Sequence, residues 1–426
     1  MSLRDKLRSR LLKNVGIYTV GNAVNAGIPF LLMPVLTRFL SPDDYGVTAM
    51  LTVLLGIYTP FIGLNLPGFV TVSYFKKTDY AQIVSTVCWI IVFVFVMALF
   101  LTRLIEGVIS EITNFPLDWL WMIVVICFAN ILIEILQNFQ QVRGEAKKYA
   151  LFKIAQTGTC MIISLSLVII LSMNWQGVVI AQLVTAVMFM SIAVIILFRY
   201  KLLRFQFNKL YMYKGISWGV PLIPHALSGI FLIASDRIFI SNMIGISEVG
   251  IFSVGYTLGR ALELIASSFN KAYSPWLYKK LKDVDMGKLD ERYGIVRLTY
   301  ACIATFVFLS GIYSIFMLCF LDYILGETFQ EASKYICGFA VATAFNAIYY
   351  LVVNYIFYSN KTSYLAMITF ACSVIHIIVT YMFISFFGAV GASYAAVITA
   401  GIKTTCTWWL SNKVYPMPWK IWRSEV

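Results

Sequence analysis

Residues 82–102 read QIVSTVCWIIVFVFVMALFLT and contain no charged side chain. A helix needs roughly 20 such residues to cross a bilayer, and in lipid only helices or closed barrels satisfy every backbone polar group. Other uncharged runs lie at 14–37, 46–70, 154–175, 298–321, 335–358 and 377–402. Further runs are clear once one or two internal polar residues are tolerated, at 119–141, 176–198, 215–242 and 249–273. We read the run 377–402 as parts of two helices that meet near residues 386–389. The sequence therefore predicts an all-α integral membrane protein of about twelve transmembrane helices.

The composition agrees with this interpretation. Of 426 residues, 60% are hydrophobic and only 12% are charged, whereas a soluble domain has about 25% charged residues. The net charge of +13 would suit a nucleic-acid-binding protein, but its distribution indicates otherwise. Most Lys and Arg residues of the short loops lie on the side of the N-terminus, and the opposite side has only Arg38, Arg103 and Lys334. By the positive-inside rule we expect both termini in the cytoplasm and no nucleic-acid partner.

Signals for catalysis, metal binding and disulfides are weak. The eight Cys residues are scattered through apolar runs without the spacing of a metal site or a disulfide framework. The chain has no G-x-x-x-x-G-K-[ST] phosphate-binding loop and only two His residues. A D-x-D sequence at residues 283–285 lies in a short charged loop with no nucleotide-binding domain around it. We therefore expect neither an enzyme nor a cofactor, and a function built inside the helix bundle.

The two halves of the chain resemble each other. Residues 44–47 (DYGV) match residues 248–251 (EVGI), and residues 177–181 (GVVIA) match residues 391–395 (GASYA). Six helices per half is an even number, so both halves would have the same orientation and enclose a site between them. We expect an N-lobe at 1–206 and a C-lobe at 207–426. Two G-x-x-x-G pairs are predicted to be sites of close helix packing, Gly215/Gly219 and Gly255/Gly259.

Three short motifs carry a family resemblance: Lys13-Asn14 at the start of the first helix, PVLTRFLS at 34–41, and SDRIFI at 235–240. In these motifs the chain resembles the polysaccharide transporters. These are the Wzx-type flippases of the MOP (multidrug/oligosaccharidyl-lipid/polysaccharide) superfamily, which also holds the MATE drug exporters and the lipid II flippase. The resemblance covers the whole chain and implies a MATE-like fold of two six-helix lobes.

The resemblance also implies a function. The substrate would be an undecaprenyl-diphosphate-linked oligosaccharide for O-antigen of lipopolysaccharide, capsule or exopolysaccharide. It would move to the outer leaflet of a bacterial inner membrane by alternating access, coupled to Na⁺, H⁺ or the membrane potential. Membrane lipids and the polymerase and chain-length proteins of the pathway would be its partners.

Two alternatives to a flippase remain. A MATE-like drug or cation antiporter is expected to have an acidic residue in its first helix, and 14–37 has none. A membrane glycan polymerase or ligase is expected to have a large outer loop, and none is present.

Charged residues at bilayer depth are costly and usually face a bundle interior or a wet cavity. Arg260 and Lys271 are eleven residues apart, which in one continuous helix places them within roughly 20° of the same face. We expect them to attract the diphosphate, since Arg binds its oxygens bidentately and Lys supplies a mobile charge. The alternative is that Arg260 pairs with Glu263 and that Lys271 extends to the cytoplasmic interface.

Further polar groups within the helices are candidates for the same cavity. Arg237 would contact phosphate or sugar and Asp236 a cation or proton, or else the two would form an interhelical ion pair. His225 shares a face with Asp236. It would carry a proton, or else serve in packing or hydrogen bonding. Arg38 would add a cation at the outer end of the first helix, or merely anchor that helix. The first helix has a polar stripe that includes Asn14, Asn22 and Asn25. This stripe would line the cavity, or else join neighbouring helices. Glu134 and Lys403 would also line the cavity.

Overall fold

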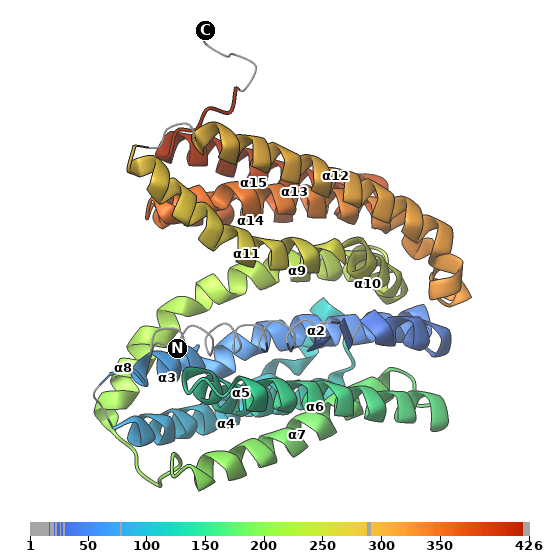
Figure 1. Cartoon of the computed structure of the whole chain (residues 1–426). Helices are drawn as coiled ribbons and strands as arrows, with labels where there is room; N and C mark the ends of the chain where they lie inside the picture. The colour runs from blue at the N-terminus through green and yellow to red at the C-terminus, as the bar shows by residue number, and fades with distance from the viewer. Residues whose placement is uncertain are drawn as a thin grey trace. The chain divides into compact units, whose positions relative to one another are not determined.

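The computed structural model describes residues 30–76, 79–287 and 291–420, together with residues 17, 21, 24, 25, 27 and 28. The described residues are helical apart from short connections, and no strand occurs among them. They form two compact units, residues 1–250 and residues 251–426 (Figure 1).

Unit 1 contains a short helix, Phe30–Phe39, followed by α2 to α9 and the first residues of α10. The bounds are α2 Pro42–Gly63, α3 Leu66–Ser73, α4 Tyr80–Thr113, η1 Leu117–Trp119, α5 Leu120–Val142, α6 Ala146–Leu165, η2 Ser166–Ile170, α7 Trp175–Arg199, α8 Lys209–Gly219, η3 Val220–Leu222, α9 Ile223–Met243 and α10 Ile246–Gly259.

Helix α5 is the central element of unit 1. It packs against α2, α3, α4, α6 and α7, and most of its residues are buried. A helix that is apolar on nearly every face can bury all of these faces against neighbouring helices. By contrast α4 exposes Phe93, Phe100 and Leu104, as expected for a helix that faces lipid along part of its length.

A sharp turn separates α2 from α3, where one continuous run was expected. Leu64 and Asn65 both have left-handed backbone angles, with φ of 46° and 52°. The side-chain amide of Asn65 donates to the carbonyl of Gly219 at 3.3 Å. A Cβ on Gly219 would lie 2.0 Å from the carbonyl oxygen of Leu64, so only glycine permits this approach of α8 to the turn. The turn therefore serves to seat α8 on the α2–α3 corner.

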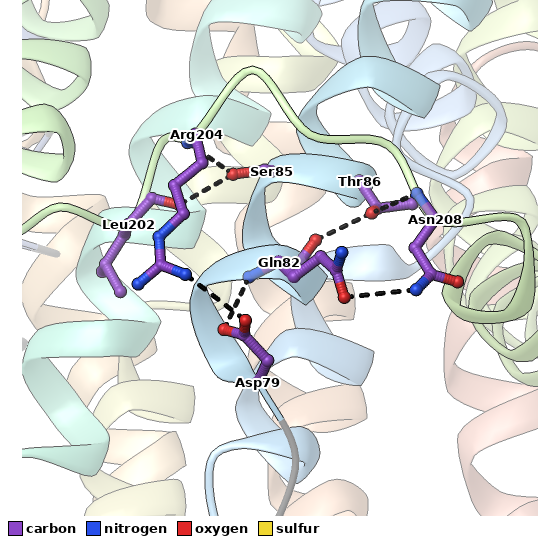
Figure 2. A network of polar contacts seen from close by, with 7 residues as sticks. All are labelled: Asp79, Gln82, Ser85, Thr86, Leu202, Arg204 and Asn208. Carbon is purple, nitrogen blue, oxygen red and sulfur yellow. Dashed lines mark hydrogen bonds and ion pairs between the residues drawn. The ribbon is translucent and has the colours of Figure 1, made fainter.

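The connection between α7 and α8 is fastened to the beginning of α4. Figure 2 shows this segment passing over the first turns of that helix. The Ser85 hydroxyl accepts from the backbone N–H of Arg204 at 2.7 Å and donates to the carbonyl of Leu202 at 3.0 Å. The backbone N–H of Asn208 donates to Thr86 at 3.2 Å, and its side-chain amide donates to Gln82, one turn before Thr86, at 3.1 Å. The segment is therefore a fixed part of unit 1.

Unit 2 contains the rest of α10 and five long helices. The bounds are α11 Leu262–Asp285, α12 Glu291–Ile324, η4 Glu327–Ala332, α13 Ser333–Tyr358, α14 Thr362–Phe387 and α15 Val390–Val414. Helix α13 is the central element and packs against α11, α12, α14 and α15. It contains alanine and glycine among larger side chains and has a long buried set, which lets neighbouring backbones approach closely.

The expected spans agree with the observed helices. Within the described residues nine helices are long and apolar enough to cross a membrane, and the bent pair α8–α9 makes ten. Helix α15 covers the last expected span, and the helix Phe30–Phe39 covers the end of the first expected span, 14–37, part of which lies outside the described residues. The split expected near 386–389 falls at Gly388, which has φ of 64°. The structure is an all-α membrane protein of the predicted class.

Two features differ from the sequence-based picture, and one is confirmed. The repeat predicted lobes at 1–206 and 207–426, whereas the compact units divide at Gly250 because α8 and α9 pack on α2, α3 and α4. The run 249–273 is interrupted at Arg260. The predicted close-packing glycines are confirmed, since a Cβ on Gly259 would lie 2.5 Å from Cβ of Phe339 and one on Gly215 would lie 3.2 Å from Leu66.

A cationic cluster in the second unit

Arg260 lies in the break between α10 and α11. The backbone tightens there, because the N–H of Ala261 bonds the carbonyl of Leu258 and the N–H of Glu263 bonds the carbonyl of Arg260, each three residues back. A turn of this type advances about 120° per residue instead of 100°. The eleven-residue calculation that placed Arg260 and Lys271 on one face assumed a continuous helix, so it does not hold across this break.

The Arg260 side chain is held by a tyrosine of the preceding turn. Its Nη1 donates to the hydroxyl of Tyr256 at 2.6 Å, and its guanidinium carbon lies 5.1 Å from the Tyr256 ring centroid. Nη2 lies 3.4 Å from Oε2 of Glu263, an ion pair in which the side chains are 32% and 20% exposed. The pairing of Arg260 with Glu263 that the sequence suggested as an alternative is therefore present.

A second cation completes the cluster from α15. Lys403 donates to Oδ1 of Asn346 at 2.6 Å and lies 4.7 Å from the Tyr349 ring centroid, both on α13. Asn346 and Tyr349 lie within one turn of Tyr350 on the same helix. The hydroxyl of Tyr350, also on α13, donates to Oε1 of Glu263 at 2.6 Å. Residues from α10–α11, α13 and α15 thus meet in one polar cluster of unit 2.

The cluster has an excess of positive charge. Arg260 and Lys403 bring two cations, and Glu263 brings one carboxylate. The side chains of all three residues are half-buried. A guanidinium offers five donors in a planar fork, and one close bond to Tyr256 leaves most of them for an oxyanion. The arrangement can bind a phosphate or another multivalent anion.

Polar contacts continue along the interface of α11 and α13. Oδ1 of Asn354 accepts from the Ser274 hydroxyl at 2.9 Å and from the Tyr278 hydroxyl at 3.3 Å, and its amide donates to Asn270 at 2.8 Å. At the end of α11, Asp285 accepts from Tyr358 at 2.6 Å and from Tyr415 at 2.7 Å. Asp285, the second carboxylate of the D-x-D sequence, therefore bonds two tyrosines and has a structural role.

Sequence reasoning did not identify these tyrosines and asparagines. The signal that could have revealed them is the four-residue spacing of polar side chains on α13, which recurs as Asn346, Tyr350, Asn354 and Tyr358.

The other predicted cations lie elsewhere. Lys271 is exposed on α11, and its side chain makes no hydrogen bond or ion pair within the part of the chain that the structure describes. In unit 1, Asp236 and Arg237 are 3% and 6% exposed on α9. Their burial is typical of groups that join packed helices. Arg38 and His225 are exposed.

Unit 1 has a polar stripe of its own. Glu134 is exposed on α5 between Asn130 and Asn138, one turn away on either side. Gln156 of α6 donates to Asn130 at 3.3 Å, and Thr157 of the same helix donates to Asn25. Asn25 and Glu134, which were both predicted to line the cavity, therefore lie along the same polar stripe. Asn14 and Asn22 lie outside the described residues.

Solved structures of known transporters share this fold. The lipid II flippase MurJ in an inward closed conformation superposes with a TM-score of 0.73 at 14% identity, covering 93% of this chain and 87% of that one. An inward-facing multidrug resistance MATE family transporter of the MOP superfamily gives 0.69 at 10% identity, covering 93% and 97%. The Vibrio cholerae MATE transporter VcmN in the bent form gives 0.61 at 11% identity, covering 96% and 97%. The chain therefore has the fold that the MurJ and MATE structures share.

Sequence comparison shows the family of the chain. It belongs to the polysaccharide biosynthesis protein family, whose sequence profile matches residues 11–280. A Haemophilus influenzae protein described as an uncharacterized membrane protein is 26% identical over 372 residues, which is 83% of this chain and 85% of that protein. The "Lsg locus putative protein 1" of the same species is 22% identical over 397 residues, covering 86% and 90%.

Proposed function

We propose that the protein flips a polyprenyl-diphosphate-linked oligosaccharide from the inner to the outer leaflet of a bacterial inner membrane. The observation that carries the proposal is the cluster in which Arg260 and Tyr350 contact Glu263, while Lys403 contacts Asn346 one turn before Tyr350 on α13. A diphosphate has at least two negative charges and oxygens that suit a guanidinium fork. Membership of a polysaccharide biosynthesis family makes a lipid-linked sugar the substrate class that fits this chemistry.

The physical task is to move a charged headgroup through oil. Desolvating an ion at bilayer depth is costly, and fixed cations offset that cost while the polyprenyl tail remains in lipid. With the termini in the cytoplasm, the anionic headgroup moves outward through an inside-negative potential. This movement gains about 2.3 kcal/mol per charge for each 100 mV. Rocking of the two repeated halves would supply alternating access. Binding and translocation require no covalent chemistry, so the proposal assigns no catalytic residue.

The test is loss of Arg260 in a strain that depends on this gene for its surface glycan. Arg260→Ala removes the guanidinium and should abolish surface glycan while the protein remains in the membrane at normal level. Arg103→Ala is the matched control, because Arg103 is 74% exposed and pairs only with Glu106 one turn along α4 among the described residues. Normal glycan from Arg260→Ala at normal protein level would overturn the proposal.

A drug or cation antiporter is the second candidate, because MATE multidrug transporters share the fold. It predicts that cells expressing the protein extrude ethidium, and that extrusion survives Arg260→Ala because a cationic substrate does not need a cationic cluster. Ethidium extrusion without any effect on glycan would favour this second candidate.

A further inference from the structure

Glu263 is a partly satisfied carboxylate in the middle of the cluster. Its Oε1 accepts from Tyr350 at 2.6 Å. Its Oε2 is buried and receives no hydrogen bond from the described residues, and Arg260 approaches it only to 3.4 Å. A charge-assisted hydrogen bond is normally about 2.7–2.9 Å long. The ion pair with Arg260 is therefore loose, although both groups belong to adjacent turns of the same chain segment.

Both cations are positioned by groups other than Glu263. Tyr256 holds the guanidinium of Arg260 through a hydrogen bond and through its ring. Asn346 and Tyr349 hold the ammonium of Lys403 in the same two ways. If the carboxylate moved away, both cations would keep these neutral partners and remain in place. Glu263 thus supplies charge to the cluster and is not needed for its geometry.

We propose that Glu263 is an internal counter-anion that neutralises the cations in the empty transporter and that the phosphate oxygens of the substrate displace. This inference rests on the proposed function, and it assigns a separate step to a separate residue. Two cations at bilayer depth without an anion are costly. A carrier that has released its substrate must still return through a closed state, and a nearby carboxylate lowers the cost of that return.

The loose contact follows from the same requirement. A short, bidentate pair between Glu263 and Arg260 would compete strongly with the substrate for the same donors. At 3.4 Å the carboxylate gives charge compensation but leaves the fork of the guanidinium available. Tyr350 keeps the displaced carboxylate within reach, so that it returns when the substrate leaves. The tyrosine is a positioning residue in this scheme.

Binding of farnesyl diphosphate to the purified full-length protein in detergent tests the inference. This short polyprenyl diphosphate is soluble enough for calorimetry. Glu263→Gln keeps an acceptor for Tyr350 and removes the charge, so it should bind the probe about tenfold more tightly than the unaltered protein. Tyr350→Phe leaves every charge in place but lets the carboxylate approach Arg260, so it should bind several-fold more weakly. Glu331→Gln is the control, because Glu331 is exposed and pairs with Lys334.

Transport assays give a second, independent readout. In proteoliposomes, Glu263→Gln should retain exchange of labelled for unlabelled probe, in which the site is never empty while it reorients. It should lose net flux about tenfold, because net flux requires the empty state to return. A merely structural role for Glu263 would reduce exchange and net flux together.

The outcomes separate this inference from the proposed function. Weaker binding in Arg260→Ala together with unchanged or weaker binding in Glu263→Gln would overturn the role of Glu263 and leave the flippase proposal standing. Binding that does not depend on Arg260, or no binding of the probe by the unaltered protein, would overturn both. Opposite shifts in Glu263→Gln and Tyr350→Phe, with Glu331→Gln unchanged, would support both.

Discussion

Gly46 and Gly250 lie against each other where α2 and α10 begin. A Cβ on Gly250 would be 3.0 Å from the amide nitrogen of Gly46 and 2.0 Å from the carbonyl oxygen of Pro42. A Cβ on Gly46 would be 2.1 Å from the carbonyl oxygen of Ile246. Pro42 and Ile246 have the same separation along the chain as the two glycines. The contact is therefore reciprocal, as in a two-fold related pair, and the two copies of the repeated tetrapeptide touch each other.

Alanine at either glycine should disturb this contact strongly. The atoms that a Cβ would meet belong to backbone, which cannot rotate away as a side chain can. We expect Gly250→Ala to destabilise the protein by about 1–3 kcal/mol or to abolish its accumulation. Thermal unfolding in detergent measures the effect. Gly158→Ala is the control, since no atom of the described residues lies within 4 Å of a Cβ there; equal melting temperatures for the two variants would contradict the steric argument.

Lys403 should matter through its charge. Lys403→Met keeps the apolar length of the side chain, removes the cation, and should reduce surface glycan roughly tenfold, as expected for the loss of one desolvated charge contact. Glycan measured at graded expression levels separates reduced rate from reduced protein. Lys413→Met is the matched control, because Lys413 lies near the end of the same helix and stacks on Trp409. Equal glycan in both variants would remove Lys403 from the binding site.

Ser85 should hold the α7–α8 connection in place. Its hydroxyl is 2% exposed and serves both the N–H of Arg204 and the carbonyl of Leu202. Ser85→Ala leaves two backbone groups without that partner, at a local cost of about 1–3 kcal/mol. Trypsin should then cleave after Lys201 and Arg204 faster than in the unaltered protein. Ser191→Ala tests specificity, because that hydroxyl bonds only the preceding turn of its own helix. Unchanged cleavage in Ser85→Ala would show that other bonds suffice.

Tyr415 should contribute to stability in a pH-dependent way. Burial, and then the Asp285 carboxylate to which it donates, raise the pKa of the Tyr415 phenol above its usual range. Because the pKa is higher in the folded chain than in the unfolded one, this contribution is fully present below about pH 10 and is lost as pH rises through the folded value. Tyr415→Phe should lower the free energy of unfolding by about 1–2 kcal/mol at pH 8.

The difference between Tyr415→Phe and the unaltered protein should shrink in melting experiments above pH 10. Tyr364→Phe provides the comparison, since Tyr364 is exposed in the same unit. A difference that stays constant from pH 8 to pH 11 would argue against the titration of Tyr415.

The sequence alone predicted that the chain crosses the membrane, how many helices it has and where its positive charges lie. Each is a local property: a run such as 82–102 is apolar whatever surrounds it, and lipid leaves its backbone no choice but a helix. Arg260 could be singled out for the same reason, because a cation within an apolar run is conspicuous. The repeat of DYGV and EVGI could be found as well, but not the contact between its two copies.

Packing settled the partners of each polar group. The rotation of a helix about its axis changes at a tightened turn, so the break at Arg260 altered which faces of α10 and α11 coincide. Whether Arg260 meets Glu263, Tyr256 or open solvent then depends on how α13 and α15 approach. The tyrosines and asparagines of the cluster are ordinary residues in sequence and become distinctive only as neighbours of these charges. Which residues of different helices pair depends on their distance in space. That distance cannot be predicted from hydropathy or from the spacing of residues along one helix.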